Sequence, residues 1–234
     1  MNRKERDALI QEFVIATDAE KKEKIAYRIW DEALYAGIYP ASIQGVYEAR
    51  GKGACSGFTV PAINLRTLTY DLASAIFRVA KKINAGAFIF EIARSEMGYT
   101  DQKPLEYTTV ILAAALREGY KGPVFIQGDH FQINAKKYKA DPKGEVEGLK
   151  KIIKEAIEAG FLNIDIDSST LVDISKKTLE EQQQLNFEIC AEMTKHIRSL
   201  QPKGVEVSVG GEIGEVGTKN STPEEFRAYM QGLL

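Results

Sequence analysis

The chain contains few residues of the kinds that hold small or metal-stapled proteins together. Among its 234 residues there are two cysteines, Cys55 and Cys190, and they form no Cys-x-x-Cys pair. A disulfide framework is therefore not expected, and a reducing compartment such as the cytoplasm is the predicted location. There are also only two histidines, His130 and His196, so a mechanism that needs a pair of imidazoles from this chain has only these candidates.

Long hydrophobic runs and an excess of one charge are absent as well. No stretch of about 18 apolar residues is present, so we expect no membrane partner. The first residues are charged and lack an apolar segment, which argues against a signal peptide. Lys and Arg number 31 and Asp and Glu 33, and this formal net charge of −2 argues against nucleic-acid binding through bulk charge. The 44% of hydrophobic residues is enough to bury a sizeable core.

Residues 1–50 are predicted to form a helical N-terminal extension. Apolar residues recur there at helical spacing, and the second helix is expected over Ala19–Tyr35. Pro40 is expected to open a third short helix, because proline suits the first helical turn. Residues 51–57 hold three glycines and are interpreted as a linker. The apolar stripe of the extension predicts that it packs against the rest of the domain or against another copy of the chain.

From residue 58 onward, apolar runs of strand length alternate with helical patterns. The strands are expected at 58–64, 87–93, 123–129, 163–167 and 205–210, and the helices at 67–84, 104–119, 143–160, 179–200 and 222–234. This alternation predicts an α/β fold, either a (β/α)8 barrel or an open doubly wound sheet. An eight-stranded barrel usually needs about 200–250 residues. Residues 58–234 are therefore expected to be either an open five-stranded sheet or a partial barrel of about five βα units in a C-terminally truncated chain.

Three of the predicted strand ends carry side chains that bind metals. His130, Asp167 and Glu212 follow the third, fourth and fifth strands, and ligands of α/β folds sit at this edge of the sheet. One imidazole and two carboxylates suit zinc or another divalent cation. Asp129 would face the other side of a regular strand, but at a strand end it could turn inward and carry a proton. Equally, the two acids could be helix caps or loop residues, and His130 an ordinary loop histidine.

Four segments resemble motifs of the class II, metal-dependent fructose-bisphosphate aldolases. They are FTVPAIN at 58–64, GDH at 128–130, IDSS at 166–169 and GEIG at 211–214. The corresponding family patterns are V-P-A-x-N, H-x-D-H, I-D-x-S and E-x-E-L-G. Each match is weak alone, but the four occur in the family order. The chain resembles a divergent branch of the family that carries a helical N-terminal extension.

This resemblance implies a (β/α)8 barrel and a lyase of carbohydrate metabolism that acts in glycolysis. The reaction would be the reversible cleavage of a ketose bisphosphate, such as fructose 1,6-bisphosphate, to dihydroxyacetone phosphate and an aldehyde. Zinc, the implied cofactor, acts as a Lewis acid on the ketone and stabilises the enediolate. The implied partners are the phosphorylated sugar and, in a homo-oligomer, further copies of the chain.

The resemblance also implies roles for individual residues. His130 would bind the catalytic zinc, and Asp129 would exchange the proton of the substrate hydroxyl at the bond that breaks. Asn64 would contact the substrate. Asp167 and Glu212 would serve a second or alternative metal position.

Departures from the family patterns leave alternatives open. Gln127 stands where the family has the first histidine of H-x-D-H, and the two further zinc-binding histidines of the family lie beyond the fifth strand. With one histidine where three protein ligands are needed, the 234 residues by themselves are expected to bind metal weakly and to cleave little or nothing. One alternative is a non-catalytic accessory or scaffold subunit of the kind found with tagatose-bisphosphate aldolases. Another is an open doubly wound domain, although no G-x-G-x-x-G for a dinucleotide follows the first strand.

Overall fold

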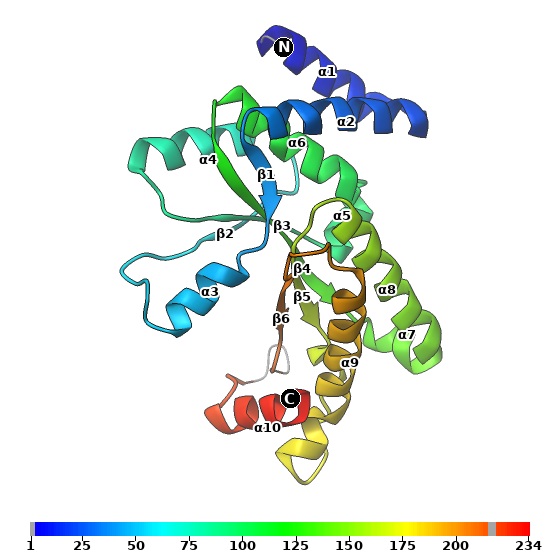
Figure 1. The fold of residues 1–234 in the computed structure, drawn as a ribbon. Coiled ribbons are helices and arrows are strands. Elements are labelled where there is room, and N and C mark those ends of the chain that lie inside the picture. The colour runs from blue at the N-terminus through cyan, green and yellow to red at the C-terminus, as the bar shows by residue number, and fades with distance from the viewer. Residues whose placement is uncertain (1–2, 215–218) are drawn as a thin grey trace.

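The computed structural model describes residues 3–214 and 219–234, and Figure 1 shows their arrangement. The helices are α1 (Arg3–Ile15), α2 (Ala19–Tyr35), α3 (Gln44–Gly51), α4 (Thr69–Ile83), α5 (Arg94–Thr100), α6 (Pro104–Arg117), α7 (Ala135–Ala140), α8 (Pro142–Glu158), α9 (Leu179–Leu200) and α10 (Pro223–Leu233), with a 3-10 turn η1 (Ser169–Leu171). The strands are β1 (Ile38–Ala41), β2 (Ala62–Asn64), β3 (Ile89–Ala93), β4 (Gly122–Gln132), β5 (Asn163–Asp167) and β6 (Ser208–Gly211).

The strands form one parallel sheet whose main path follows the chain. The order is β2-β3-β4-β5-β6, and each strand is parallel to its neighbours. Sequential order is that of a barrel wall, because the order of a doubly wound sheet reverses at a switch point. In the described part of the chain β2 and β6 do not pair with each other, so the sheet is open. The fold is α/β and corresponds to part of a (β/α)8 barrel.

The expected elements from residue 58 onward all occur. The strand β5 and the helix α9 have the predicted bounds, and the other strands and helices differ from the expectation at their ends. The prediction missed two short helices, α5 and α7, that follow the carboxyl ends of β3 and β4. Both are short, and seven and six residues are too few to show a helical period.

The third short helix occurs as α3, but it begins at Gln44 and not at Pro40 as expected. Pro40 lies in β1, which pairs in parallel with the first part of β4, Ile38 opposite Gly122 and Ala41 opposite Phe125. Because β3 pairs with the opposite edge of β4, β1 lies on the same edge as β5 and ends where β5 begins. Proline is tolerated there because β1 pairs with one neighbour only and an unpaired edge needs no donor.

The N-terminal segment covers two surfaces of the sheet domain. The helix α2 packs on α6, where the Trp30 indole Nε1 donates to Thr109 Oγ1 at 3.1 Å and Lys22 Nζ lies 2.8 Å from Glu106 Oε2. The α3 segment packs at the amino ends of the strands, where buried Ile43 contacts Ala87 and Ile89. The extension therefore fills the bottom of the partial barrel. Its treatment as a unit separate from 58–234 stays a prediction.

The main core lies between the sheet and the helices, and β5 shows how its sequence divides the two faces. Ile164 and Ile166 are buried against the helical layer. Asn163, Asp165 and Asp167 alternate with them and point to the other face. No helix within residues 3–214 and 219–234 is both long enough and apolar enough to cross a membrane.

Replacing Gly160 with alanine is expected to destabilise the chain. Gly160 follows α8 with a φ of +81°, and an added Cβ would lie 3.0 Å from Pro40 and 3.1 Å from Trp30. The left-handed conformation alone costs an alanine about 1–2 kcal/mol. Gly45→Ala is the matched control, because an added Cβ on α3 meets nothing and helical alanine is favoured by about 0.5–1 kcal/mol. Urea unfolding measures both, and a Gly160→Ala variant as stable as the wild type would contradict the expectation.

Candidate active site

An irregularity in β4 brings two functional side chains to one face of the sheet. The register of β4 against β5 shifts between Gly128 and Phe131, because Gly128 pairs with Ile164 and Phe131 pairs with Ile166. Three steps on β4 thus match two on β5, which leaves one extra residue, a β-bulge. His130 within this bulge has a φ of +42°, and such a conformation costs a non-glycine residue about 1–3 kcal/mol.

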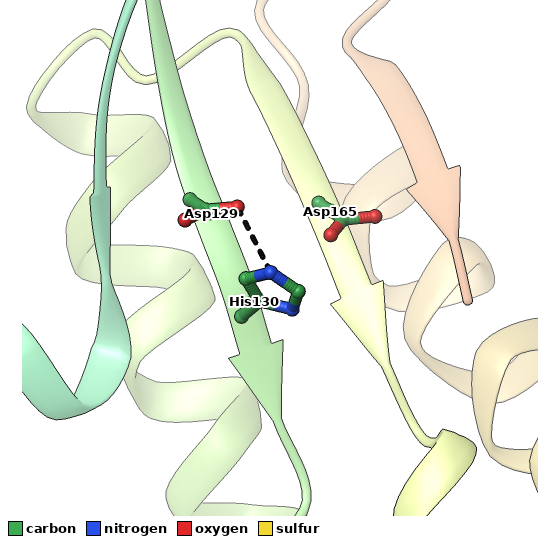
Figure 2. Close-up of side chains that lie close together, drawn as sticks. All are labelled: Asp129, His130 and Asp165. Atoms are coloured by element: carbon green, nitrogen blue, oxygen red, sulfur yellow. Dashed lines mark ion pairs between the residues drawn. The ribbon is translucent and has the colours of Figure 1, made fainter. Parts of the chain in front are cut away.

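The bulge determines the face of the sheet to which the Asp129 side chain points. Neighbouring side chains on a regular strand point to opposite faces. Here Asp129 and His130 both approach Asp165 of β5, and one ligand atom from each of the three lies within 4.8 Å of the others. Figure 2 shows these side chains between the two strands. Asp129 therefore turns toward the same side as His130 and Asp165.

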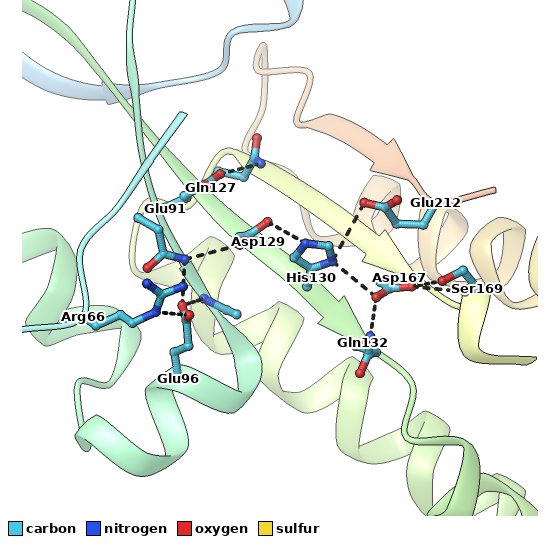
Figure 3. Close-up of polar contacts among 12 residues, drawn as sticks. Arg66, Glu91, Glu96, Gln127, Asp129, His130, Gln132, Asp167, Ser169 and Glu212 are labelled. Carbon is cyan, nitrogen blue, oxygen red and sulfur yellow. Dashed lines mark hydrogen bonds and ion pairs between the residues drawn. The ribbon is translucent and has the colours of Figure 1, made fainter. Parts of the chain in front are cut away.

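The imidazole of His130 lies among carboxylates from three strands or strand ends. Its Nε2 is 3.6 Å from Asp129 Oδ1, and its Nδ1 is 3.3 Å from Asp167 Oδ2 and 3.8 Å from Glu212 Oε1. Figure 3 shows this arrangement. Burial alone would lower the pKa of His130, but the charges of Asp129 and Asp167 outweigh it and raise the pKa. The structure thus brings together the three residues that the sequence predicted as metal ligands.

Asp167 is fixed by hydrogen bonds to both of its carboxylate oxygens. Its side chain is buried, and Oδ1 accepts hydrogen bonds from Ser169 N at 3.1 Å and from Ser169 Oγ at 2.7 Å. The other oxygen, Oδ2, accepts from Gln132 Nε2 and faces His130. These bonds fix the carboxylate and occupy part of its capacity as a ligand.

Sequence reasoning missed Asp165, which is part of the three-residue group. It lies two residues before Asp167 on β5, so alternation along the strand would have placed both on the same face. Burial, followed by the charges of Glu212 and Asp129, raises the pKa of Asp165 to about 7. Burial and the charge of Asp129 likewise raise the pKa of Glu91 on β3 to about 7.

Asn64 reaches the site from β2. Its Nδ2 donates to Glu96 Oε2 at 2.7 Å and approaches Asp129 Oδ2 at 3.4 Å, while its buried Oδ1 has no hydrogen-bond partner among the described residues. Glu96 in turn accepts from Ala93 N at 2.9 Å and from Arg66 Nε. Asn64 is therefore at the site, as expected, and it links Asp129 to a second set of polar contacts.

The pH dependence of stability should report the bonds to Glu96. Burial opposes ionisation of Glu96, but the hydrogen bonds from Ala93 N, Asn64 and Arg66 outweigh it and hold the pKa below the usual 4.5. A folded-state pKa below the unfolded value stabilises the chain above the unfolded value, and this stabilisation is lost as pH falls through the folded pKa.

In Glu96→Gln we therefore expect lower stability at pH 7 and a smaller loss of stability between pH 5 and pH 3. Urea unfolding at a series of pH values measures both. The control is Glu155→Gln, the same charge change at an exposed position on α8. Equal pH slopes for Glu96→Gln and the wild type would contradict this assignment.

A cavity of about 610 Å³ opens beside the cluster. Its lining includes Asp129, His130 and Asp167 together with three cationic side chains, Arg66, Arg94 and Lys137. Arg94 is already paired with Glu145 at 2.6 Å. Cavities of about 300–1,000 Å³ hold small-molecule ligands, so this one has room for a small molecule.

The donor set fits one divalent cation but differs from a three-histidine site. His130 supplies an imidazole nitrogen, and Asp129 and Asp165 supply carboxylate oxygens at mutual distances that one ion can span. The second histidine, His196, lies on α9 with Nε2 3.2 Å from the carbonyl oxygen of Lys150. His196 is therefore not part of the cluster, and the chain contains no third histidine.

Known proteins resemble this chain in sequence and in fold. A family model described as "Fructose-bisphosphate aldolase class-II" matches residues 49–231. Among solved structures, a probable tagatose 6 phosphate kinase from Sinorhizobium meliloti 1021 is similar with a TM-score of 0.52 and 16% sequence identity. That match covers 75% of this chain and 44% of the other, so the chain spans less than half of that protein, and the likeness concerns the fold alone. No curated protein matches the chain.

Proposed function

The chain belongs to the class II fructose-bisphosphate aldolase family, and on this premise we propose that it acts in a metal-dependent aldolase. The substrate is a ketose bisphosphate such as fructose 1,6-bisphosphate, which gives dihydroxyacetone phosphate and an aldehyde. The observation that carries the proposal is the bulge of β4, which sets Asp129 and His130 side by side among further carboxylates.

The residues of the site have separate roles in this proposal. His130 holds a divalent metal, zinc or a similar ion, with Asp167 and Glu212 at 3.3 and 3.8 Å from its Nδ1 as further or alternative ligands. When bound, the metal supplies Lewis-acid polarisation of the substrate ketone. Asn64 positions Asp129 through its Nδ2 and lies where it would contact the substrate.

Asp129 carries the proton. As a carboxylate it accepts the proton of the substrate hydroxyl at the carbon–carbon bond that breaks, which leaves the bonding electrons on the dihydroxyacetone phosphate fragment. In the reverse direction it returns this proton to the new alkoxide. Burial raises the pKa of Asp129, which makes the carboxylate a stronger base.

Arg66, Arg94 and Lys137 line the same cavity and favour a phosphorylated substrate. We further propose that the enzyme is cytoplasmic and works as a homo-oligomer without nucleic-acid or membrane partners. One histidine in the cluster supports weak metal binding and little or no cleavage by the 234 residues by themselves.

The test measures metal binding and catalysis separately. The purified chain is titrated with Zn²⁺ by calorimetry, and dihydroxyacetone phosphate release from fructose 1,6-bisphosphate is followed with and without a chelator. The same assay is run on the complete product of the reading frame. We expect weak zinc binding by the chain and chelator-sensitive cleavage by the complete product. Absence of metal binding and of cleavage in both would overturn the aldolase assignment.

An accessory or scaffold subunit is a second candidate. It is favoured by Gln127, whose Nε2 donates to Glu91 Oε2 at 3.2 Å where the family has a histidine. If the chain is such a subunit, affinity purification should recover a separate aldolase chain with it at fixed stoichiometry. The chain alone should then show no chelator-sensitive cleavage. Cleavage by the complete product without any partner would exclude this candidate.

A further inference from the structure

Asp165 is a carboxylate without a partner in a crowded, partly buried position. It lies on the face of β5 that carries Asp167, not on the face that packs against the helices. Within the described part of the chain it accepts no hydrogen bond and forms no ion pair, although Glu212 and Asp129 add negative charge around it. A carboxylate that is partly removed from water is stabilised by a charge partner, and a bound cation is one such partner.

The neighbouring strand β6 approaches this carboxylate closely at a glycine. Gly210 of β6 pairs with Asp165, and a Cβ added to Gly210 would lie 2.6 Å from Asp165 Oδ1. Any side chain at position 210 would therefore displace the Asp165 carboxylate. Glycine here is required by close approach and not by a positive φ, since Gly210 does not have one.

On the other side, the strained backbone of His130 points its imidazole toward the same space. Ligand atoms of Asp165, His130 and Asp129 lie within 4.8 Å of one another, a separation that a single cation bridges. The strain at a φ of +42° persists only where the surroundings favour that geometry. A cation shared by His130 and Asp165 would relieve the repulsion among the acids and add such a constraint.

We propose that Asp165 is a protein ligand of the divalent cation at His130, accommodated by Gly210. The proposal rests on the proposed function for the presence of a metal, and it assigns to Asp165 a role that the family motifs do not. Asp129 keeps its role with the proton, while Asp167 is hydrogen-bonded to Ser169 and Gln132.

The test is calorimetric titration of the whole chain with Zn²⁺ and, separately, with Mn²⁺. Asp165→Asn removes the charge and keeps the shape. Since loss of an outer-shell partner alone costs about 10–100-fold in metal affinity, Asp165→Asn should weaken binding by at least about tenfold. The matched control is Asp31→Asn, the same change at an exposed position on α2, which should leave affinity unchanged. Equal affinities of Asp165→Asn and the wild type would overturn the proposal.

A second variant guards against simple misfolding. Asp165→Ala combined with Gly210→Asp moves the carboxylate from β5 to β6, and the Cβ of residue 210 would point at the vacated position. This double variant should recover metal affinity relative to Asp165→Ala alone. Circular dichroism shows whether each variant is folded. A folded double variant that binds no better than Asp165→Ala would also count against a ligand role.

The outcomes separate this proposal from the proposed function. Metal binding that depends on Asp165, in a protein without aldolase activity, would support the ligand and overturn the aldolase. Chelator-sensitive cleavage by a complete product whose metal affinity is insensitive to Asp165→Asn would support the aldolase and overturn the ligand.

Discussion

Replacing His130 with alanine is expected to lower the affinity of the chain for Zn²⁺ by at least about 100-fold, beyond the range for outer-shell partners. His130 supplies the only imidazole of the cluster, and its two nitrogens face Asp129 on one side and Asp167 and Glu212 on the other. Without it, the remaining donors are carboxylates, which suit magnesium, calcium or manganese better than zinc. Calorimetric titration with Zn²⁺ measures the loss.

The chain provides its own control for this substitution. His196 is the second histidine, and its Nε2 contacts the carbonyl oxygen of Lys150 on the α8–α9 surface. His196→Ala should therefore leave zinc affinity unchanged. If the two alanine variants lose affinity equally, zinc binds elsewhere and the cluster at the end of β4 is not the metal site. Retained zinc affinity in His130→Ala alone would lead to the same conclusion.

The bulge adds a second consequence for His130. Alanine does not favour a positive φ any more than histidine does, so the strain remains in His130→Ala while the contacts of the imidazole are lost. His130→Gly would relieve the strain and also remove the imidazole. Loss of zinc affinity in both variants, with higher thermal stability in His130→Gly, would separate the metal ligand from the backbone conformation.

The arrangement of the barrel strands was predictable because it depends on short-range pattern. Apolar runs of strand length, each followed by a helical period, define β2 to β6 and the helices between them without any knowledge of partners. Parallel strands in sequential order then place all their carboxyl ends at one edge. For this reason His130, Asp167 and Glu212 could be expected at one site, and the structure places them there.

Two parts of the site depend on contacts that the local pattern does not contain. The bulge at Asp129 and His130 arises from the register between β4 and β5, which are separated by two helices in the sequence. The sequence pattern did not identify the place of Asp165 in the site, because that place depends on the close approach of Gly210 on the next strand, β6. An observer who applied strand alternation to Asp167 would have found Asp165, but not the space that accommodates it.

The strand β1 could not be predicted from the sequence for the same physical reason. Four residues with a proline give no period, and Pro40 is as compatible with the first turn of a helix as with a strand that needs no donor. What makes this segment a strand is its pairing with β4, more than 80 residues later in the chain. The residue that secures this pairing is Asn163, at the start of β5.

Asn163→Ala is accordingly expected to reduce the free energy of unfolding by about 3 kcal/mol, because each buried backbone group left unpaired costs about 1–3 kcal/mol. The buried Asn163 side chain accepts from Ile43 N at 2.8 Å and donates to Ile126 O at 2.9 Å and to Ala41 O at 3.2 Å. One amide thus joins the end of β1, the middle of β4 and the start of β5. Urea unfolding measures the change.

The control for this prediction is Asn220→Ala, at an exposed position, which should change stability by less than about 0.5 kcal/mol. Hydrogen exchange gives a local reading, since the Ile43 amide loses its acceptor in Asn163→Ala and should exchange faster than its neighbours in α3. If Ile43 kept its protection and stability were unchanged, β1 would be held by its ladder with β4 alone. The observed bonds favour the opposite result, because β1 is only four residues long and Asn163 bonds to both Ala41 at its end and Ile43 just beyond.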